Sequence, residues 1–220
     1  MLSKRLSVIA ALVNKNSIVA DIGSDHGLLP CFLIKNNIAI KAYAMDNKQG
    51  PLKSAIENIE LYALKAKVIP VLSDGLNKLS TDVTSIVIAG MGFITIKTIL
   101  ESNIDLLENI DQVIIQSNTD VNMLRKWIYD KQYLLKNEKI VKDNNKYYFI
   151  FDIDPKTKNI YNDNNFLISS ILVENKDELY LEYLSVELKK LKKINLLRKD
   201  ESLLRQINII ENTLAGKLNL

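Results

Sequence analysis

Apolar and polar positions alternate in blocks along the first 130 residues. Short continuous apolar runs, rich in β-branched residues, predict strands buried on both faces, and longer stretches with apolar residues at every third or fourth position predict helices. Because the two kinds of block alternate, the pattern predicts a doubly wound, Rossmann-like α/β sheet that is mostly parallel. We expect strands at residues 18–21, 40–45, 67–72, 85–89 and 111–115, and helices over 3–13, 28–35, 51–62, 93–107 and 123–129.

The pattern changes after residue 130. Residues 133–141 and 146–153 have the composition of strands, and the polar stretch 143–145 between them favours a turn. Two strands joined by so short a turn pair antiparallel. We therefore expect an antiparallel hairpin at the edge of the sheet.

The C-terminal part differs from the sheet domain in its periodicity. The polar stretches 154–158 and 162–165 indicate a domain boundary, which gives domains at 1–160 and 161–220. Beyond the boundary, leucine and isoleucine recur by threes and fours over 181–191 and again over 203–214, with a polar break between them. This favours a coiled-coil-like α-helical hairpin, with one unbroken helix as the alternative.

Composition narrows the class of protein. The chain has 220 residues, of which 47% are apolar and 25% charged, so it has enough material for one good core and a small additional unit. We expect no membrane span and no signal peptide, hence a cytoplasmic protein, and we expect a monomer. With a single cysteine, Cys31, and a single histidine, neither an internal disulfide nor a Cys/His metal site is expected.

The positive charge is unevenly distributed. The net charge is +3, and the surplus lies in the C-terminal part of the chain. Such a cluster suits a polyanionic partner, although a solvated helix face is the alternative. The basic residues concerned are Lys189, Lys190, Lys192, Lys193, Arg198, Lys199 and Arg205, against Glu187, Asp200 and Glu201.

The first predicted strand runs into an acidic and glycine-containing turn, residues 21–27. At such a turn, backbone N–H groups and a helix N-terminus point outward, Gly23 allows a ligand to approach the backbone, and Asp21 adds a carboxylate. Asp25 stands where a dinucleotide-binding fingerprint has its second glycine, and it would repel a pyrophosphate. The turn therefore favours a nucleoside-type cofactor without phosphates, such as S-adenosylmethionine; a nucleotide and a purely structural turn are the alternatives.

Other predicted strands also end in acids or glycines. Asp46 follows the second strand, where it could accept hydrogen bonds from a ribose or could cap the next helix. Asp74 follows the third strand and could hold an exocyclic amine, while glycines after the fourth strand would let a flat group approach. The candidate cofactor-binding residues are Asp21, Gly23, Ser24, Asp46, Asn47, Asp74, Gly75, Ala89, Gly90 and Met91.

Several short motifs together resemble one known family. They are Ser3-x-Arg5-Leu6, residues 20–30 (Ala-Asp-Ile-Gly-Ser-Asp-His-x-x-Leu-Pro), Asp74-Gly75-Leu76, residues 88–92 (Ile-Ala-Gly-Met-Gly) and Gln116-x-Asn118. The chain resembles the bacterial tRNA (adenine(22)-N1)-methyltransferases, which are class I S-adenosylmethionine-dependent enzymes. The resemblance implies methyl transfer from S-adenosylmethionine to N1 of adenine 22 in tRNA.

The resemblance also implies roles for individual residues. Asp21, Gly23 and Asp25 would hold the methionine end of the cofactor, Asp46 its ribose and Asp74 its adenine. Because adenine N1 already carries a lone pair, catalysis would consist mostly of alignment, with the base held by hydrogen bonds. The candidates for that task are Asp25, His26, Gly92 and Asn118.

Simpler roles are open for two of these candidates. His26 could be a helix-terminal residue satisfied by the backbone, and Asn118 a turn or N-cap residue. Phe93 and Ser117 depart from the family pattern, which commonly has glycine and proline there. The alternative functions are a methyltransferase acting on another RNA or a small molecule, and a non-catalytic ligand-binding scaffold that uses its helical hairpin to bind partners.

Overall fold

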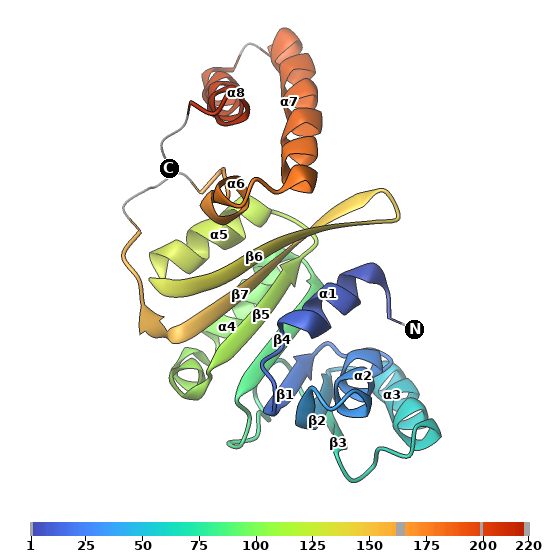
Figure 1. Ribbon diagram of the computed structural model, residues 1–220. Helices are drawn as coiled ribbons and strands as arrows, with labels where there is room; N and C mark the ends of the chain where they lie inside the picture. The colour runs from blue at the N-terminus through green and yellow to red at the C-terminus, as the bar shows by residue number, and fades with distance from the viewer. Residues whose placement is uncertain (1, 162–165, 199, 218–220) are drawn as a thin grey trace. The chain divides into compact units, whose positions relative to one another are not determined.

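The computed structural model describes residues 2–161, 166–198 and 200–217. The chain divides into two compact units, Met1–Ile160 and Tyr161–Leu220. The first unit holds the sheet, and the second holds helices (Figure 1).

A mixed seven-stranded sheet forms the centre of the first unit. Its strands are β1 (Ser17–Ile22), β2 (Ala39–Asp46), β3 (Val68–Leu72), β4 (Ser85–Met91), β5 (Gln112–Ser117), β6 (Tyr133–Asp143) and β7 (Lys146–Lys158). Their order is β3-β2-β1-β4-β5-β7-β6. The first five strands are parallel, and β7 pairs antiparallel with both β5 and β6. The prediction of a mostly parallel sheet with an antiparallel edge hairpin is confirmed.

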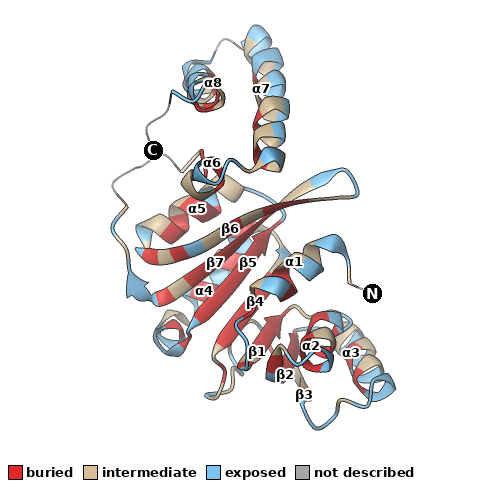
Figure 2. Ribbon diagram, in the orientation of Figure 1, coloured by how far each residue is buried: buried red, intermediate tan, exposed pale blue. Residues whose placement is uncertain are grey.

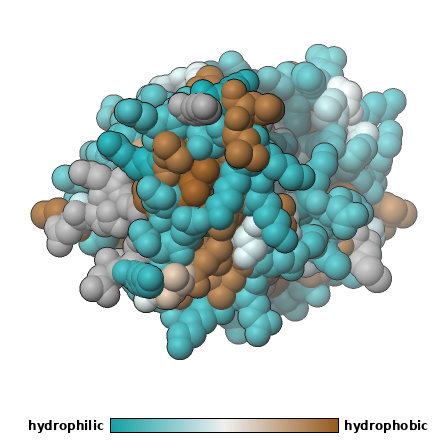
Figure 3. Space-filling view, turned by 90° about the horizontal axis from the view of Figure 1, so that it is seen from above, coloured by the Kyte–Doolittle hydropathy of each residue, from teal (hydrophilic) through white to brown (hydrophobic). Residues whose placement is uncertain are grey.

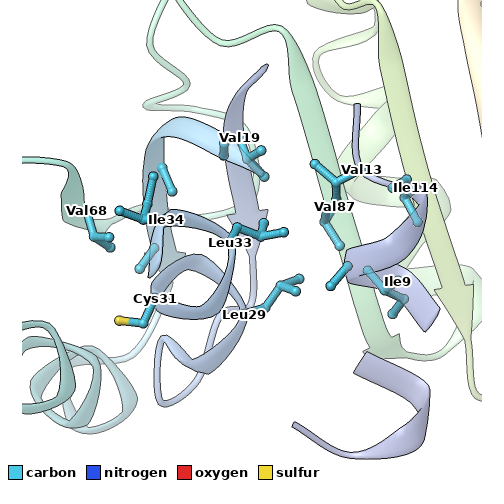
Figure 4. Packing of buried hydrophobic residues seen from close by; sticks show 14 of the residues in the cluster. Ile9, Val13, Val19, Leu29, Cys31, Leu33, Ile34, Val68, Val87 and Ile114 are labelled. Atoms are coloured by element: carbon cyan, nitrogen blue, oxygen red, sulfur yellow. The ribbon is translucent and has the colours of Figure 1, made fainter. Parts of the chain in front are cut away.

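Helices cover both faces of this sheet. They are α1 (Lys4–Leu12), α2 (Leu28–Lys35), α3 (Gln49–Leu61), α4 (Phe93–Glu101), the 3₁₀ helix η1 (Ile104–Asn109) and α5 (Val121–Asp130). On one face, side chains of α1 and α2 such as Ile9 and Leu33 pack with Val19, Val87 and Ile114 of the sheet (Figure 4). The strands β1, β2, β4 and β5 are buried over most of their length (Figure 2), as continuous apolar runs predict.

Two boundaries differ from the prediction. Instead of one helix over 93–107, α4 ends at Glu101, where the Ser102 hydroxyl donates to the Thr98 carbonyl, and η1 follows. Residues 154–158, expected as linker, belong to β7 and pair with the start of β6. The strand accommodates Pro155 where the register with β6 shifts, since a bulge is one of the few places in a sheet that tolerate proline. The polar stretch 162–165 lies outside the described residues.

The second unit contains α6 (Ser170–Glu174), α7 (Glu178–Arg198) and α8 (Glu201–Leu214). The carboxylate of Asp200 accepts the Ser202 and Leu203 N–H groups and so begins α8. The alternative of one unbroken helix is therefore wrong, and the short α6 was not predicted. Helices α7 and α8 contact each other, and Lys192 pairs with Glu211 between them at 2.6 Å. Their buried apolar residues include Leu184, Leu191, Ile207 and Ile210.

The surface of this unit is mixed in character. Leu196 and Leu197 near the end of α7 are highly exposed, beside exposed lysines. The face of the molecule in Figure 3 likewise has hydrophobic side chains interspersed among hydrophilic ones.

Candidate cofactor and base-binding site

The carboxyl ends of the parallel strands meet at one edge of the sheet, and the β1–α2 turn lies there. The N–H groups of Gly23 and Ser24 donate to the Met45 carbonyl of β2 at 2.8 and 2.9 Å. Gly23 has φ +72°, a conformation that other residues rarely adopt. The turn is thus fixed against the neighbouring strand, and these two N–H groups do not point outward to a ligand as expected, because they bond within the fold.

Asp21 lies at the base of this turn. Its side chain is buried, with 6% of the residue exposed, and it accepts a 2.7 Å hydrogen bond from the Ser24 hydroxyl. Burial raises the pKa of Asp21 to about 6, and the nearby Asp46 carboxylate adds to the rise, while Ser24 and Arg5 oppose it. A cationic ligand group placed here would favour the ionised carboxylate.

Asp46 occupies the equivalent position on β2. Its two carboxylate oxygens accept the backbone N–H groups of Asp25, at 3.2 Å, and Lys48, at 2.9 Å. Helix α3 has Lys48 at its N-cap and no side-chain cap, so the interpretation of Asp46 as a helix cap is wrong. A carboxylate has about four lone-pair positions, so hydroxyl groups of a ligand could still bind.

A pocket of about 300 Å³ opens between these strand ends and α4. Gly23, Asn47, Asp74, Gly75 and Met91 line it on the side of the strand ends, as do Ile22 and Ser73. The facing wall is mostly apolar and comes from Ile94, Thr95, Thr98 and Ile99 of α4. A pocket with one polar and one apolar wall suits a flat ring that carries polar atoms on its edge.

Met91 reaches across the pocket to Gly23. A Cβ atom on Gly23 would meet the terminal methyl of Met91, but that flexible side chain could move aside, so it is the φ of +72° that favours glycine here. Five of the predicted cofactor-binding residues lie outside the pocket lining: Asp21, Ser24, Asp46, Ala89 and Gly90. The apolar wall of α4 is the part of the pocket that the sequence reasoning missed, although the helical periodicity of that segment was visible.

Next to the pocket, Gly90, Gln116 and Asn118 form a closed ring of hydrogen bonds. The Gly90 N–H donates to Gln116 Oε1 at 3.0 Å, Gln116 Nε2 donates to Asn118 Oδ1 at 3.1 Å, and Asn118 Nδ2 donates to the Gly90 carbonyl at 2.7 Å. Asp120, not Asn118, is at the N-cap of α5, so the N-cap interpretation of Asn118 is wrong. The ring brings the ends of β4 and β5 together.

Arg5 of α1 also contacts this ring of hydrogen bonds. It donates to Gln116 Oε1, and its guanidinium lies 5.4 Å from the centre of the Tyr148 ring on β7. A Cβ atom on Gly90 would lie 3.1 Å from the Arg5 guanidinium, so the missing side chain leaves room for it. Sequence reasoning quoted Arg5 and Gln116 within motifs but assigned them no site role.

The remaining base-binding candidates, Asp25, His26 and Gly92, lie beside the pocket, at what we call its rim. The side chains of Asp25 and His26 are 65% and 55% exposed, and their carboxylate and imidazole are 3.5 Å apart. Both residues lie outside the pocket lining. Gly92 precedes α4, and a Cβ atom there would only reach normal contact, 3.4 Å, with the Thr119 hydroxyl.

We also searched the described part of the chain for a metal site, a membrane-spanning helix and a reactive thiol. Residues 2–161, 166–198 and 200–217 contain no His/Cys/Asp/Glu cluster that could hold a metal ion. Within these ranges, every helix is too short or too polar to cross a bilayer. Cys31 is buried, and burial raises the pKa of its thiol to about 11, which keeps it protonated and unreactive.

Comparison with known proteins identifies the family. The "Methyltransferase domain" family matches residues 2–151. A Bacillus subtilis (strain 168) tRNA (adenine(22)-N(1))-methyltransferase is 32% identical over 193 residues, which cover 85% of this chain and 81% of the relative. The chain belongs to the tRNA (adenine(22)-N(1))-methyltransferase family.

Solved structures agree with this assignment. The structure of M. capricolum TrmK in complex with S-adenosyl-homocysteine is 33% identical, covers 98% of both chains and has a TM-score of 0.86. The B. subtilis M1A22 tRNA methyltransferase TrmK is 26% identical, with a TM-score of 0.81 over 98% of this chain and 96% of that chain. The resemblance seen in the sequence motifs, and the class I fold it implied, are confirmed.

Proposed function

We propose that this protein transfers the methyl group of S-adenosylmethionine to N1 of adenine 22 in tRNA. The observation that carries the proposal is the 32% identity to a tRNA (adenine(22)-N(1))-methyltransferase over most of both chains. The pocket at the strand ends supports it, because a ligand site at this edge is the rule for open α/β sheets. A different methyl acceptor and a non-catalytic scaffold are less well supported.

The residues present fit S-adenosylmethionine. The carboxylate of Asp21, at the base of the turn, suits the charged methionine end, and Asp46 suits the ribose hydroxyls. Asp74 and Gly75 face the apolar wall of α4 across the pocket, which suits adenine with its amino group toward the acid. Asn47, Met91, Ala89 and Gly90 lie along the same strand ends. A similar solved structure contains the demethylated product of this cofactor.

The chemical demands on the chain are small. When bound, the cofactor supplies a methyl group activated by a positively charged sulfur. The adenine N1 lone pair needs no general base, so the task of the protein is to unstack the base, align N1 and exclude water. We assign that task to the rim, where Asp25, His26, Gly92 and Asn118 lie.

The second unit is the candidate for holding the body of the tRNA. Its exposed lysines and arginines on α7 and α8 suit phosphate contacts, which supply most non-specific affinity for nucleic acid. We propose this division of labour between residues 1–160 and 161–220, action as a monomer and a cytoplasmic location, where tRNA is modified.

Methylation of an unmodified tRNA transcript with labelled S-adenosylmethionine tests the proposal. We expect one methyl group per tRNA, mapped to N1 of adenine 22, and no incorporation when guanine replaces that adenine. Incorporation at another position or only into a small molecule would contradict the proposal.

The cofactor site has its own test in calorimetry. Asp46→Asn removes the charge that would accept the ribose hydroxyls, and we expect it to weaken S-adenosylmethionine binding by about tenfold to a hundredfold. Asp82→Asn is the matched control, because Asp82 pairs with Lys41 before the amino end of β4, away from the pocket. Equal affinities for the wild type and Asp46→Asn would refute the ribose assignment.

A further inference from the structure

The orientation of the Asn118 amide is determined by obligate donors and acceptors. The Gly90 N–H and the Arg5 guanidinium can only donate, so the Gln116 atom facing them must be oxygen, and its other atom must be the NH₂ nitrogen. That nitrogen faces Asn118, whose atom there must be oxygen. The remaining Asn118 nitrogen faces the Gly90 carbonyl, an obligate acceptor. The donors and acceptors of the ring therefore match in only one orientation of the two side-chain amides.

Asn118 retains hydrogen-bonding capacity that points beyond the ring. Gln116 is fully buried, but Asn118 is exposed at the mouth of the site. The ring uses one N–H of Asn118 Nδ2 and one lone pair of Oδ1. One N–H and one lone pair of the same amide therefore remain for a ligand, and they leave the amide in different directions.

Resting on the proposed function, we infer that Asn118 binds the target adenine by donating its free N–H to N7, and that Arg5 and Gln116 position the Asn118 amide. N7 is the acceptor atom of the Hoogsteen edge of adenine, and asparagine is a common partner for that edge. N1 lies on the opposite side of the base, beyond the amino group, so its lone pair stays free for the methyl group.

Arg5 and Gln116 act through Asn118 and do not touch the base in this scheme. If the Asn118 amide turned over, its oxygen would face the Gly90 carbonyl and its NH₂ group would face the Gln116 NH₂ group, which are two repulsive contacts. Gln116 can hold the productive orientation only while its own oxygen faces Gly90 and Arg5. Tyr148, under the guanidinium, keeps Arg5 in place.

The test combines a changed base with a changed side chain. The substrates are two tRNA transcripts, one with adenosine and one with 7-deazaadenosine at position 22; the latter lacks the N7 acceptor but keeps N1 and the amino group. For the wild type we expect kcat/KM to fall about tenfold on 7-deazaadenosine, the worth of one hydrogen bond to a well-placed amide. In Asn118→Ala, slower on both substrates, we expect no further fall. An equal fall in the wild type and Asn118→Ala would overturn the inference.

Variants of the positioning residues complete the experiment. Gln116→Glu keeps an acceptor for Arg5 and Gly90 but cannot donate to Asn118, so it should lose the discrimination between the two substrates and lower kcat about tenfold while S-adenosylmethionine affinity stays unchanged. Arg5→Lys should retain part of the discrimination, because it keeps one donor. Gln132→Glu, the same change at an exposed position between α5 and β6, is the control and should keep the full discrimination.

Failure of this inference is distinguishable from failure of the proposed function. No methylation of the adenosine transcript by the wild type would refute the function itself. Normal methylation with discrimination that survives in both Asn118→Ala and Gln116→Glu would refute only the role of Asn118 and its positioning residues.

Discussion

At the scale of single residues, burial changes the protonation of the Asp21 carboxyl. Its pKa of about 6 in the folded chain is above the usual 3.8, mainly because burial disfavours the charged form. The folded state therefore holds this proton more tightly than the unfolded state. The contribution of Asp21 to stability is full at acidic pH and is lost as the pH rises from about 4 to about 6.

Cofactor affinity should have the opposite pH dependence. On our assignment of Asp21 to the methionine end, its ionised form binds the ammonium group of S-adenosylmethionine. Binding should then be about tenfold weaker at pH 5 than at pH 7.5, since only about a tenth of the carboxyl is ionised one unit below its pKa. Calorimetry across this range measures the effect. Asp21→Asn should bind weakly with a flat profile, and a flat profile in the wild type would show that Asp21 does not meet a cation.

The site residues differ in how far the sequence could predict them. The acids and glycines after β1, β2 and β3 were predictable, because each directly follows an apolar run and parallel strands bring their ends to one edge. The roles of Arg5 and Gln116 were not, since their contact joins residues 111 positions apart and depends on how α1 crosses the sheet. Asp46 was placed correctly, but its hydrogen bonds to the turn backbone were not foreseen.

At the scale of elements, a buried ion pair fixes α5 to β6. Arg125 donates to both carboxylate oxygens of Glu138, at 3.2 and 2.6 Å, and the two side chains are at most 1% exposed. The guanidinium also lies 5.6 Å from the centre of the Phe151 ring. Such a pair costs much desolvation, so its main effect is that neither partner can be removed alone.

Glu138→Gln should reveal this dependence. It removes the charge of the carboxylate that accepts two hydrogen bonds from the buried guanidinium, and we expect the free energy of unfolding to fall by about 3–5 kcal/mol in urea titration. The double variant Arg125→Met with Glu138→Leu should recover most of the loss, because no charge then remains buried. A single variant as stable as the wild type would mean that the pair is not desolvated.

The elements also show where local pattern is insufficient. The strands β1 to β5 and the edge hairpin agree with their apolar runs, since burial on both faces leaves a clear signal. The extension of β7 through residues 154–158 had no such signal: its residues are polar, and the strand continues because β6 offers a partner for pairing. The end of β7 therefore depends on its pairing with β6, which the local composition of residues 154–158 cannot indicate.

At the scale of the whole molecule, the two units carry different surface chemistry. The acids and glycines of the cofactor pocket belong to residues 1–160, while α7 of the second unit bears a run of exposed lysines. Two of these lysines are already paired, Lys190 with Glu187 and Lys192 with Glu211, and both partners lie within the second unit. Lys189 and Lys193 are therefore the better probes of an electrostatic surface for tRNA.

Reversing these two charges should weaken tRNA binding without affecting the cofactor. For Lys189→Glu with Lys193→Glu we expect KM for tRNA to rise about tenfold or more at physiological salt, S-adenosylmethionine affinity to stay unchanged, and the dependence of log K for tRNA on log salt to become shallower by roughly 1 to 2, since each lost phosphate contact removes a little under one unit. Lys15→Glu with Lys67→Glu is the matched control, because both lysines are exposed before the amino ends of β1 and β3, opposite the cofactor edge. If both double variants weaken tRNA equally, the effect is one of net charge alone, and α7 is not the tRNA-binding surface.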